Sequence, residues 1–596
     1  MKVEFFDKKW AFPLLCLILP LLMILKSVLI GDYGNIGQDS DDAMRLTQIR
    51  DFMSGSQSWF DTNQYRMGPS GGTDMHWSRL TDVPLILLMS IFGFFLSAEQ
   101  AEALAITIWP PITAIFVLIG VFTGAKFLKN RNAAWVSALL AAAFLFTHYR
   151  FVAGAIDHHN IQFGLICMAV GFALDPEFKR RSFIISGICT ALSAAIGTEV
   201  YAFAAIICAY FALLWLLQGE RVRQGILGFG IALGLTLMGV FFMVTSPNDY
   251  KLLYCDSMSW IMVAAGSLGG LGLAISALKF SGQPFLTRLI ALFVLGVLCL
   301  ALFLSQAPQC LSNPLNELPH DVKTLWLDNI KEARPLFDTF EDYYLKAPLG
   351  IGITLLAITL AGLKIYRKER AIQHGLFVTI LLVGTVLSLY QLRFTVFGQF
   401  LAFIVMGIWV YELFNHKRKD GQRSIRYIGA IALSIPMVWA LPGLLLGPAD
   451  EAAPTAESRK KSDLCYSENI MDFMNTLEQG RILATSNGTS KFLLWTKHSA
   501  LSGNYHRNID GIQSNIRAFT AVPEEARGYL KKNQINYVHV CRTTQESVVL
   551  QEQNPDGLMG VLLKETPPDY LSVLSDLEDG AVTIYRFNPR RNFRGE

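Results

Sequence analysis

Apolar residues come in blocks of about 20 along residues 1–446, and short polar loops separate the blocks. A helix of that length crosses the roughly 30 Å hydrocarbon core of a bilayer. The blocks predict spans at 11–30, 104–125, 133–147, 160–174, 182–197, 199–217, 224–244, 260–278, 289–305, 347–363, 373–389, 396–414 and 427–446. We therefore expect a polytopic α-helical membrane protein with about 13 spans.

Lysine and arginine concentrate in alternate loops, for example 126–131, 179–181 and 364–370. A cytoplasmic N-terminus puts these loops inside, as the positive-inside rule requires, and an odd number of spans then puts the C-terminus outside. The first apolar block is too long for a signal peptide and lacks a small-residue cleavage site, so it is expected to remain as a span. The stretch 83–96 is short for a span and favours an interfacial or re-entrant helix.

Three long segments then lie outside: 31–103, 306–346 and 447–596. The middle segment is a candidate binding loop or gate, because long loops without regular structure are uncommon unless they are functional. The last segment opens with a polar linker, 447–463, and continues with strand-like runs. These runs are "RILATS", "KFLLW", "YVHVC" and "AVTIYRF". The sequence thus predicts a membrane domain, 1–446, followed by a soluble extracytoplasmic α/β domain, 447–596.

Charge and cysteine placement refine this picture. The 596 residues are 52% hydrophobic and carry a net charge of only +3, spread along the chain, which excludes a nucleic-acid partner. Four cysteines fall in segments predicted to lie outside, where disulfides are permitted. We expect Cys255 to pair with Cys310 and Cys465 with Cys541; the alternative is that all four are buried thiols.

The first outer loop contains "GQDSDDAMR", in which Asp39, Asp41 and Asp42 precede a pattern typical of an amphipathic helix. One aspartate is enough to cap a helix, and three close carboxylates repel one another unless a cation is near. A catalytic or metal-binding role is therefore predicted for Asp41 and Asp42, with simple capping as the alternative.

A second polar cluster, "GAIDHHNIQF", lies between two apolar blocks. Asp157 and His159 are separated by one residue and could reach a shared cation from a short loop. The alternative is that Asp157 caps the following span. Glu199, at the outer end of another span, is a further functional candidate, although an interfacial carboxylate is easily solvated.

Basic and acidic candidates recur on the same predicted side. His76 and Arg79 lie near a glycine-rich turn, Glu332 lies in "NIKEARP" of the middle loop, and Arg393 lies in "QLRFTVF" between two spans. An arginine there could bind phosphate oxygens through two hydrogen bonds. The alternative for Arg393 is that its side chain extends to the membrane surface.

These motifs occur in one order along the chain, and the set resembles the single-subunit oligosaccharyltransferases of bacteria and archaea, within the GT-C superfamily of polyprenyl-phosphate-dependent glycosyltransferases. The resemblance implies that Asp41, Asp157 and His159 hold a divalent cation, Mn²⁺ or Mg²⁺. It also implies that Glu332 is the glutamate of the family's TIxE-type loop motif and that Arg393 binds the donor pyrophosphate. We add His158, Arg79 and His76 as further candidates for donor binding.

The chain departs from this family at the acceptor. The family's outer domain carries a WWDYG signature that grips the serine or threonine of a glycosylation sequon, and no such string occurs here. The nearest candidates, within residues 487–511, are Trp495, Tyr505, His506 and Arg507. The acceptor therefore stays open among protein, lipid and glycan.

The expected function is transfer of a sugar or oligosaccharide from a polyprenyl-(pyro)phosphate donor to an acceptor, on the extracytoplasmic side of an inner or plasma membrane. Membrane lipids would surround the spans. Two rivals remain: a transporter or flippase of a lipid-linked sugar, and a non-catalytic subunit for envelope assembly. A transporter would line a pathway with charges in mid-span, whereas the acidic residues of this chain gather mostly in outer loops.

Overall fold

The computed structural model describes residues 8–37, 39–312, 315, 318–337, 343–417, 424–446 and 464–589. The chain forms two compact units. The helical unit comprises Met1–Gly37, Trp77–Ser312 and Pro335–Pro448, and the mixed unit comprises Gln38–His76, Asn313–Arg334 and Ala449–Glu596. The mixed unit thus combines parts of both predicted outer loops with the C-terminal segment. The predicted domain limit at 446 and 447 stays a prediction, and the predicted linker 447–463 lies outside the described residues.

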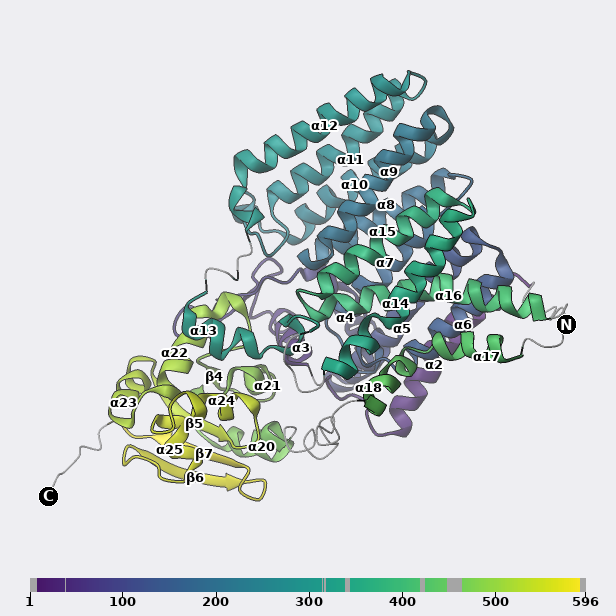
Figure 1. Cartoon of the computed structure of the whole chain (residues 1–596). Helices are drawn as coiled ribbons and strands as arrows, with labels where there is room; N and C mark the ends of the chain where they lie inside the picture. The colour runs from purple at the N-terminus through teal and green to yellow at the C-terminus, as the bar shows by residue number, and fades with distance from the viewer. Residues whose placement is uncertain are drawn as a thin grey trace. The chain divides into compact units, whose positions relative to one another are not determined.

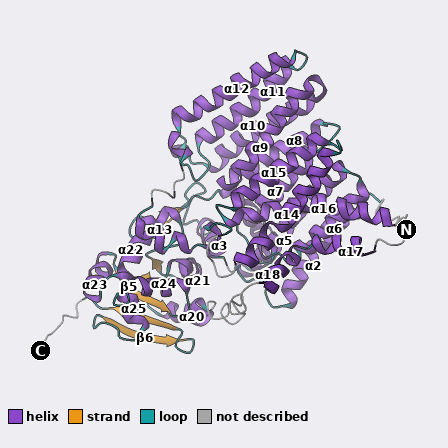
Figure 2. Cartoon of the chain, viewed as in Figure 1, coloured by secondary structure: helices purple, strands orange, loops and turns teal. Residues whose placement is uncertain are grey.

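The helical unit is built from long apolar helices (Figures 1 and 2). They are α2 (Ala11–Leu29), α4 (Asp82–Phe92), α5 (Ala98–Leu128), α6 (Arg131–Leu145), α7 (His159–Ala173), α8 (Arg180–Ile196), α9 (Tyr201–Gln218), α10 (Arg223–Val244), α11 (Trp260–Phe280), α12 (Phe285–Gln306), α14 (Tyr343–Tyr366), α15 (Ala371–Ser388), α16 (Thr395–Lys417), α17 (Ser424–Leu433) and α18 (Leu441–Leu446). Each predicted span coincides with one of these helices, except the last, which is the pair α17 and α18, bent by 87°.

Within the described residues, eight helical segments are long and apolar enough to cross a membrane, or nine if the bent pair is one span. One of the eight, Thr198–Val244, has 47 residues, about twice the length that one crossing needs. Gly219, with φ +54°, ends α9 inside this segment, so α9 and α10 can cross separately. Two further apolar helices, α6 and α7, are shorter. The chain is an integral membrane protein of the expected helical class, while the count of 13 spans stays a prediction.

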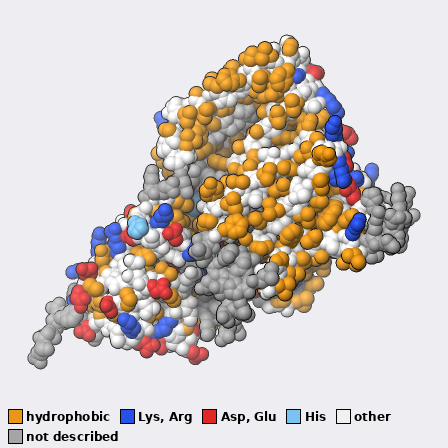
Figure 3. Space-filling model, in the orientation of Figure 1, with side chains coloured by type: hydrophobic (Ala, Val, Ile, Leu, Met, Phe, Trp, Pro, Cys, Tyr) orange, Lys and Arg blue, Asp and Glu red, His pale blue; other side chains and the backbone are white. Residues whose placement is uncertain are grey.

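Much of the packing in the helical unit joins helices that are near one another in sequence but not always consecutive. Helix α5 packs against α6 and α7, and α10 packs against α8 and α11. Helix α12, at the edge of this row in Figure 1, contains no buried residue, and hydrophobic side chains cover the visible face of the unit in Figure 3. Such an apolar surface is what lipid tails require of a membrane-spanning bundle.

The mixed unit contains a five-stranded sheet with the order β4-β3-β5-β7-β6. Its strands are β3 (Arg481–Leu483), β4 (Ser499–Ala500), β5 (Ile535–Cys541), β6 (Leu571–Leu577) and β7 (Val582–Phe587). Strand β3 runs parallel to β4 and β5, whereas β7 is antiparallel to β5 and β6. A second, two-stranded sheet pairs β1 (Asn63–Gln64) with β2 (Thr73–Asp74). The expected sheet-containing C-terminal region is present.

Helices of the mixed unit come from three parts of the chain: α3 (Ser40–Met53), α13 (His320–Leu325), α20 (Glu468–Thr476), α21 (Thr489–Trp495), α22 (Ile509–Thr520), α23 (Pro523–Lys532), α24 (Gln545–Gln553) and α25 (Leu558–Leu563). The predicted strand "KFLLW" is wrong, because it forms the second half of α21. Five of the seven residues of α21 are buried, namely Thr489, Ser490, Phe492, Leu493 and Leu494, so the run shows no clear period. A five-residue apolar run cannot by itself distinguish a buried strand from a buried helix.

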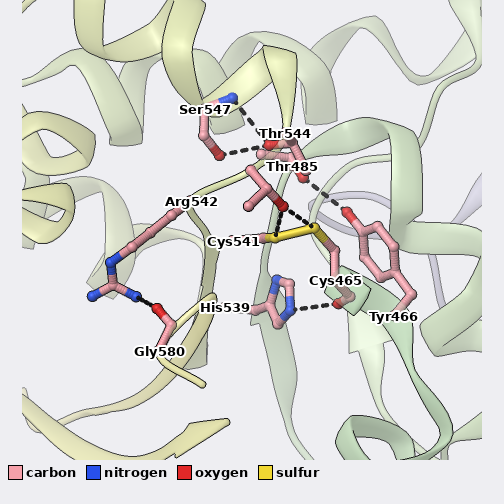
Figure 4. The surroundings of a disulfide bond; sticks show 10 residues. Cys465, Tyr466, Thr485, His539, Cys541, Arg542, Thr544, Ser547 and Gly580 are labelled. Atoms are coloured by element: carbon pink, nitrogen blue, oxygen red, sulfur yellow. Dashed lines mark hydrogen bonds between the residues drawn. A yellow bond between two sulfur atoms is a disulfide. The ribbon is translucent and has the colours of Figure 1, made fainter. Parts of the chain in front are cut away.

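Both expected disulfides are present: Cys255–Cys310 in the helical unit and Cys465–Cys541 in the mixed unit. Figure 4 shows that the second joins the chain just before α20 to the end of β5. The His539 imidazole hydrogen-bonds to the Cys465 carbonyl at 3.1 Å, and the Thr543 hydroxyl lies 3.3 Å from both sulfurs. The alternative of four buried thiols is therefore wrong for this structure.

Candidate functional site

A tight turn at Gly154 delivers the Asp157-His158-His159 motif to the start of α7. Gly154 has φ +81°, its carbonyl accepts from the Gly37 amide at 2.8 Å, and its amide donates to Ile106 at 3.0 Å. A Cβ at Gly154 would collide with the Asn35 carbonyl, so only glycine fits this turn. The turn fixes where the motif enters the helical unit.

Asp157 is the hub of a buried polar cluster. Its Oδ1 atom lies 2.6 Å from His158 Nδ1, and its Oδ2 atom lies 3.5 Å from His159 Nε2 and 3.6 Å from Arg150 Nη1. All four side chains are at most 10% exposed. His158, not Asp157, occupies the N-cap position of α7. Helix capping therefore does not account for the side-chain partners of Asp157.

Glu199 joins this cluster from the opposite side. It lies in the short 3₁₀ turn Thr198–Val200, between α8 and α9, and its Oε1 atom is 3.0 Å from His158 Nε2 and 3.4 Å from His159 Nδ1. Burial lowers the pKa of His158, but the Asp157 and Glu199 carboxylates outweigh burial and raise this pKa well above its ordinary value. The two carboxylates thus favour the protonated form of His158, and its imidazole must exchange one of these bonds to contact a donor phosphate.

The cluster has the chemistry of a metal site. Asp157, His158 and His159 each place one ligand atom within 4.8 Å of the others, a grouping that could hold a metal ion. Carboxylate oxygen with imidazole nitrogen suits Mn²⁺ and Zn²⁺, whereas Mg²⁺ favours oxygen ligands. Ligand atoms about 2.1 Å from one ion lie roughly 3.0–3.4 Å apart, and the 3.5 Å between Asp157 Oδ2 and His159 Nε2 is close to that range. The residues present therefore fit a divalent ion.

Two predicted donor-binding arginines also lie in the helical unit. Arg79 Nη1 is 3.2 Å from Asp82 Oδ2, and both side chains are buried, so the Arg79 charge is already balanced. Arg393 lies in the 3₁₀ turn Leu392–Phe394, directly before α16. Its Nε atom is buried and has no hydrogen-bond partner among the described residues. Arg393 therefore remains the stronger candidate for phosphate.

The remaining predicted site residues lie in the mixed unit. Asp39 caps α3 by accepting from the Asp41 amide at 3.2 Å, so one aspartate supplies the cap. Asp41 and Asp42 follow in the first turn, and Asp42 is buried. The helix is not amphipathic as expected, because residues 42–49 are buried on all sides. Glu332 lies in the 3₁₀ turn Lys331–Ala333 of the middle loop.

All four acceptor candidates contact residues 38–76, the segment that carries Asp41, within the mixed unit. The Tyr505 hydroxyl donates to the Ser40 carbonyl at 3.3 Å, the ring centroids of His506 and His76 lie 4.5 Å apart, and Arg507 pairs with Asp74 at 2.7 Å. The Arg50 guanidinium of α3 lies 5.1 Å from the Trp495 ring centroid.

The structure adds two residues that the predicted site did not contain. Glu199 was a functional candidate without an assigned role or partner, and Arg150 was not a candidate. Arg150 could have been found from the sequence, because it lies in the short turn Tyr149–Phe151, only seven residues before Asp157. Glu199 lies 42 residues after Asp157, and no spacing rule connects the two, so only the packing of α7 and α8 could reveal it.

No protein-family model matches the chain, and no curated protein matches it in sequence. Solved structures do match. The apo oligosaccharyltransferase of Archaeoglobus fulgidus superposes with a TM-score of 0.66 over 95% of this chain and 73% of that chain, at 16% identity.

The chain has an oligosaccharyltransferase fold. The oligosaccharyltransferase AglB from Archaeoglobus fulgidus, in complex with an inhibitory peptide and a dolichol-phosphate, gives a TM-score of 0.63 at 16% identity, and the match covers 99% of this chain and 75% of that chain. The Archaeoglobus fulgidus oligosaccharyltransferase in complex with Zn and sulfate gives a TM-score of 0.60 at 16% identity, and the match covers 93% of this chain and 71% of that chain. At this identity the oligosaccharyltransferase likeness shows the fold and leaves the chemistry to be argued from the residues.

Proposed function

We propose that this chain is a membrane glycosyltransferase that moves a sugar or oligosaccharide from a polyprenyl-phosphate-type donor to an acceptor on the extracytoplasmic side. The observation that carries the proposal is the buried Asp157-His158-His159-Glu199 cluster in a chain with an oligosaccharyltransferase fold. The apolar helices would accommodate the lipid tail of the donor. The fold match to a protein solved with dolichol-phosphate supports a lipid-linked donor.

In this proposal the N-terminus is cytoplasmic, and the loops that carry the disulfides face an oxidising compartment such as the exterior of an inner or plasma membrane. The two disulfides support that side assignment, because they persist only under oxidising conditions. The charge distribution between loops gives the same orientation.

Each residue has one role in the proposed transfer. In the helical unit, Asp157 and His159 would hold a divalent ion, which when bound would stabilise negative charge on the leaving phosphate. Arg393 binds donor phosphate oxygens through charge-assisted hydrogen bonds, with Arg79 and His158 of the same unit as further donor contacts. Asp41 or Asp42 orients or deprotonates the acceptor, and Glu332 acts beside them.

The test is a transfer assay on the purified full-length chain in detergent. The donor is a polyprenyl-pyrophosphate-linked glycan fraction extracted from membranes, and the acceptor is membrane material from a strain that lacks the gene. Mass spectrometry should find glycan newly attached to protein, lipid or polysaccharide, and the class that gains it identifies the acceptor. Transfer should stop with EDTA and resume with added Mn²⁺ or Mg²⁺.

An Asp157→Ala variant should lose transfer, whereas Asp175→Asn should keep it. Asp175 is a matched control, because it is a buried carboxylate of the same unit that bonds to Ser182 beyond the far end of α7. Lipid-linked glycan that crosses a proteoliposome membrane without any transfer would favour the flippase. Full complementation of a deletion strain by the Asp41→Ala/Asp157→Ala double variant would favour an assembly subunit.

A further inference from the structure

Glu199 contacts both histidines of the candidate metal site. Its Oε1 atom is 3.0 Å from His158 Nε2 and 3.4 Å from His159 Nδ1. The other nitrogen of each ring faces Asp157, at 2.6 Å for His158 Nδ1 and 3.5 Å for His159 Nε2. Both imidazoles therefore lie between two carboxylates, with Asp157 on one side and Glu199 on the other.

This arrangement has a consequence for the histidine tautomer. A neutral imidazole that uses one nitrogen as a ligand carries its proton on the other nitrogen, and that N–H usually meets a carboxylate or a carbonyl. For His159, a proton on Nδ1 points at Glu199 and leaves the Nε2 lone pair directed toward Asp157. Glu199 thus lies where a metal-binding histidine usually has the carboxylate that accepts a hydrogen bond from its second ring nitrogen.

The local structure is shaped to hold Glu199 there. The 3₁₀ turn begins directly after Gly197, and a Cβ at Gly197 would collide with the Glu199 carboxylate. The Gln162 side chain, one turn along α7 from His158, reaches the Gly197 carbonyl at 3.4 Å. The Glu199 side chain is 15% exposed, so its interactions are weakly screened by water.

We infer that Glu199 is a positioning residue that orients His159, through its Nδ1 atom, toward a divalent ion bound at Asp157. This inference rests on the proposed function, because the ion belongs to that proposal. His158 links the two carboxylates, with Nδ1 at 2.6 Å from Asp157 and Nε2 at 3.0 Å from Glu199.

The test is Mn²⁺ binding to the purified full-length chain in detergent, with Mn²⁺ alone as the probe. Electron paramagnetic resonance gives the dissociation constant, and electron spin echo modulation detects imidazole nitrogen bound to the ion. Glu199→Ala should weaken Mn²⁺ binding by about 10- to 100-fold and reduce the nitrogen signal. Glu199→Gln should lose less than about tenfold, because its amide oxygen can still accept from Nδ1–H.

Asp175→Asn is the control, since the 15 residues of α7, about 22 Å of helix, lie between His159 and the Asp175 turn. It should bind Mn²⁺ like the wild type. Wild-type affinity and an unchanged nitrogen signal in Glu199→Ala would overturn the inference while the proposed function stands. A wild-type chain that takes up no Mn²⁺ would overturn the inference and the metal-dependent part of the proposal, whether or not glycan is transferred.

Discussion

Removing the Cys465–Cys541 disulfide should destabilise the mixed unit strongly. The bond closes a loop of 76 residues, and the loss of chain entropy in the unfolded state corresponds to about 4.5 kcal/mol for a loop of that length. Measured losses for native disulfides are usually about 2–5 kcal/mol, so this value is near the upper end. A Cys465→Ser/Cys541→Ser variant isolates the effect, because the Thr543 hydroxyl lies 3.3 Å from both positions and can pair with the new hydroxyls.

The assay is hydrogen exchange of the β5 peptide, read by mass spectrometry on the full-length chain. A loss of about 4.5 kcal/mol corresponds to exchange faster by on the order of a thousandfold, provided that exchange proceeds through unfolding of this unit. Reducing the wild-type chain should give the same acceleration. The matched control, Cys255→Ser/Cys310→Ser, opens a 55-residue loop in the helical unit and should leave β5 exchange unchanged. Unchanged β5 exchange in the Cys465→Ser/Cys541→Ser variant would refute the argument.

Three further predictions concern the site and the core. Asp157→Asn should remove most of the glycan-transfer activity, and excess Mn²⁺ should restore part of it. A variant that is fully active without metal would show that Asp157 does not bind a metal ion. Arg393→Ala should weaken binding of the lipid-linked donor by about 1.5–3 kcal/mol, measured from the dissociation constant, and Arg393→Lys should recover only part of this binding energy. An unchanged dissociation constant in Arg393→Ala would contradict a contact between Arg393 and the donor phosphate. Burial lowers the pKa of His539 to about 4, below the 6.5 of an unfolded histidine, so folding disfavours its protonation. Stability should therefore fall by about 3 kcal/mol as pH drops from 6.5 to 4, and in urea unfolding His539→Gln should show a smaller loss.

Hydropathy predicted the helical unit well, because each span needs about 20 apolar residues and the chain provides them in separate blocks. It could not find the break at Gly219, which depends on one residue with positive φ inside a continuous apolar segment. Short runs were less informative, since the run 491–495 fits a strand by composition and forms a helix by packing.

The site was predictable only where its residues are neighbours in sequence. Asp157, His158 and His159 are consecutive, so their clustering follows from the motif itself. Glu199 and His506 could not be placed, because their contacts with His158 and His76 join segments 41 and 430 residues apart. The predicted residues also divide between the two units, with Asp41, Asp42, His76 and Glu332 in the mixed unit and the others in the helical unit.

The charges of the cluster around Asp157 explain why Asp157→Asn should weaken binding of the divalent ion. Asp157 and Glu199 carry two negative charges, and Arg150 with protonated His158 carries two positive ones, so these four side chains are neutral together. A divalent ion at Asp157 would add the positive charge that an anionic donor head group needs. Asparagine preserves the shape and one acceptor oxygen but removes the negative charge that would attract the ion. A neutral amide oxygen binds a divalent ion more weakly than a carboxylate, so high Mn²⁺ concentration can restore binding only in part.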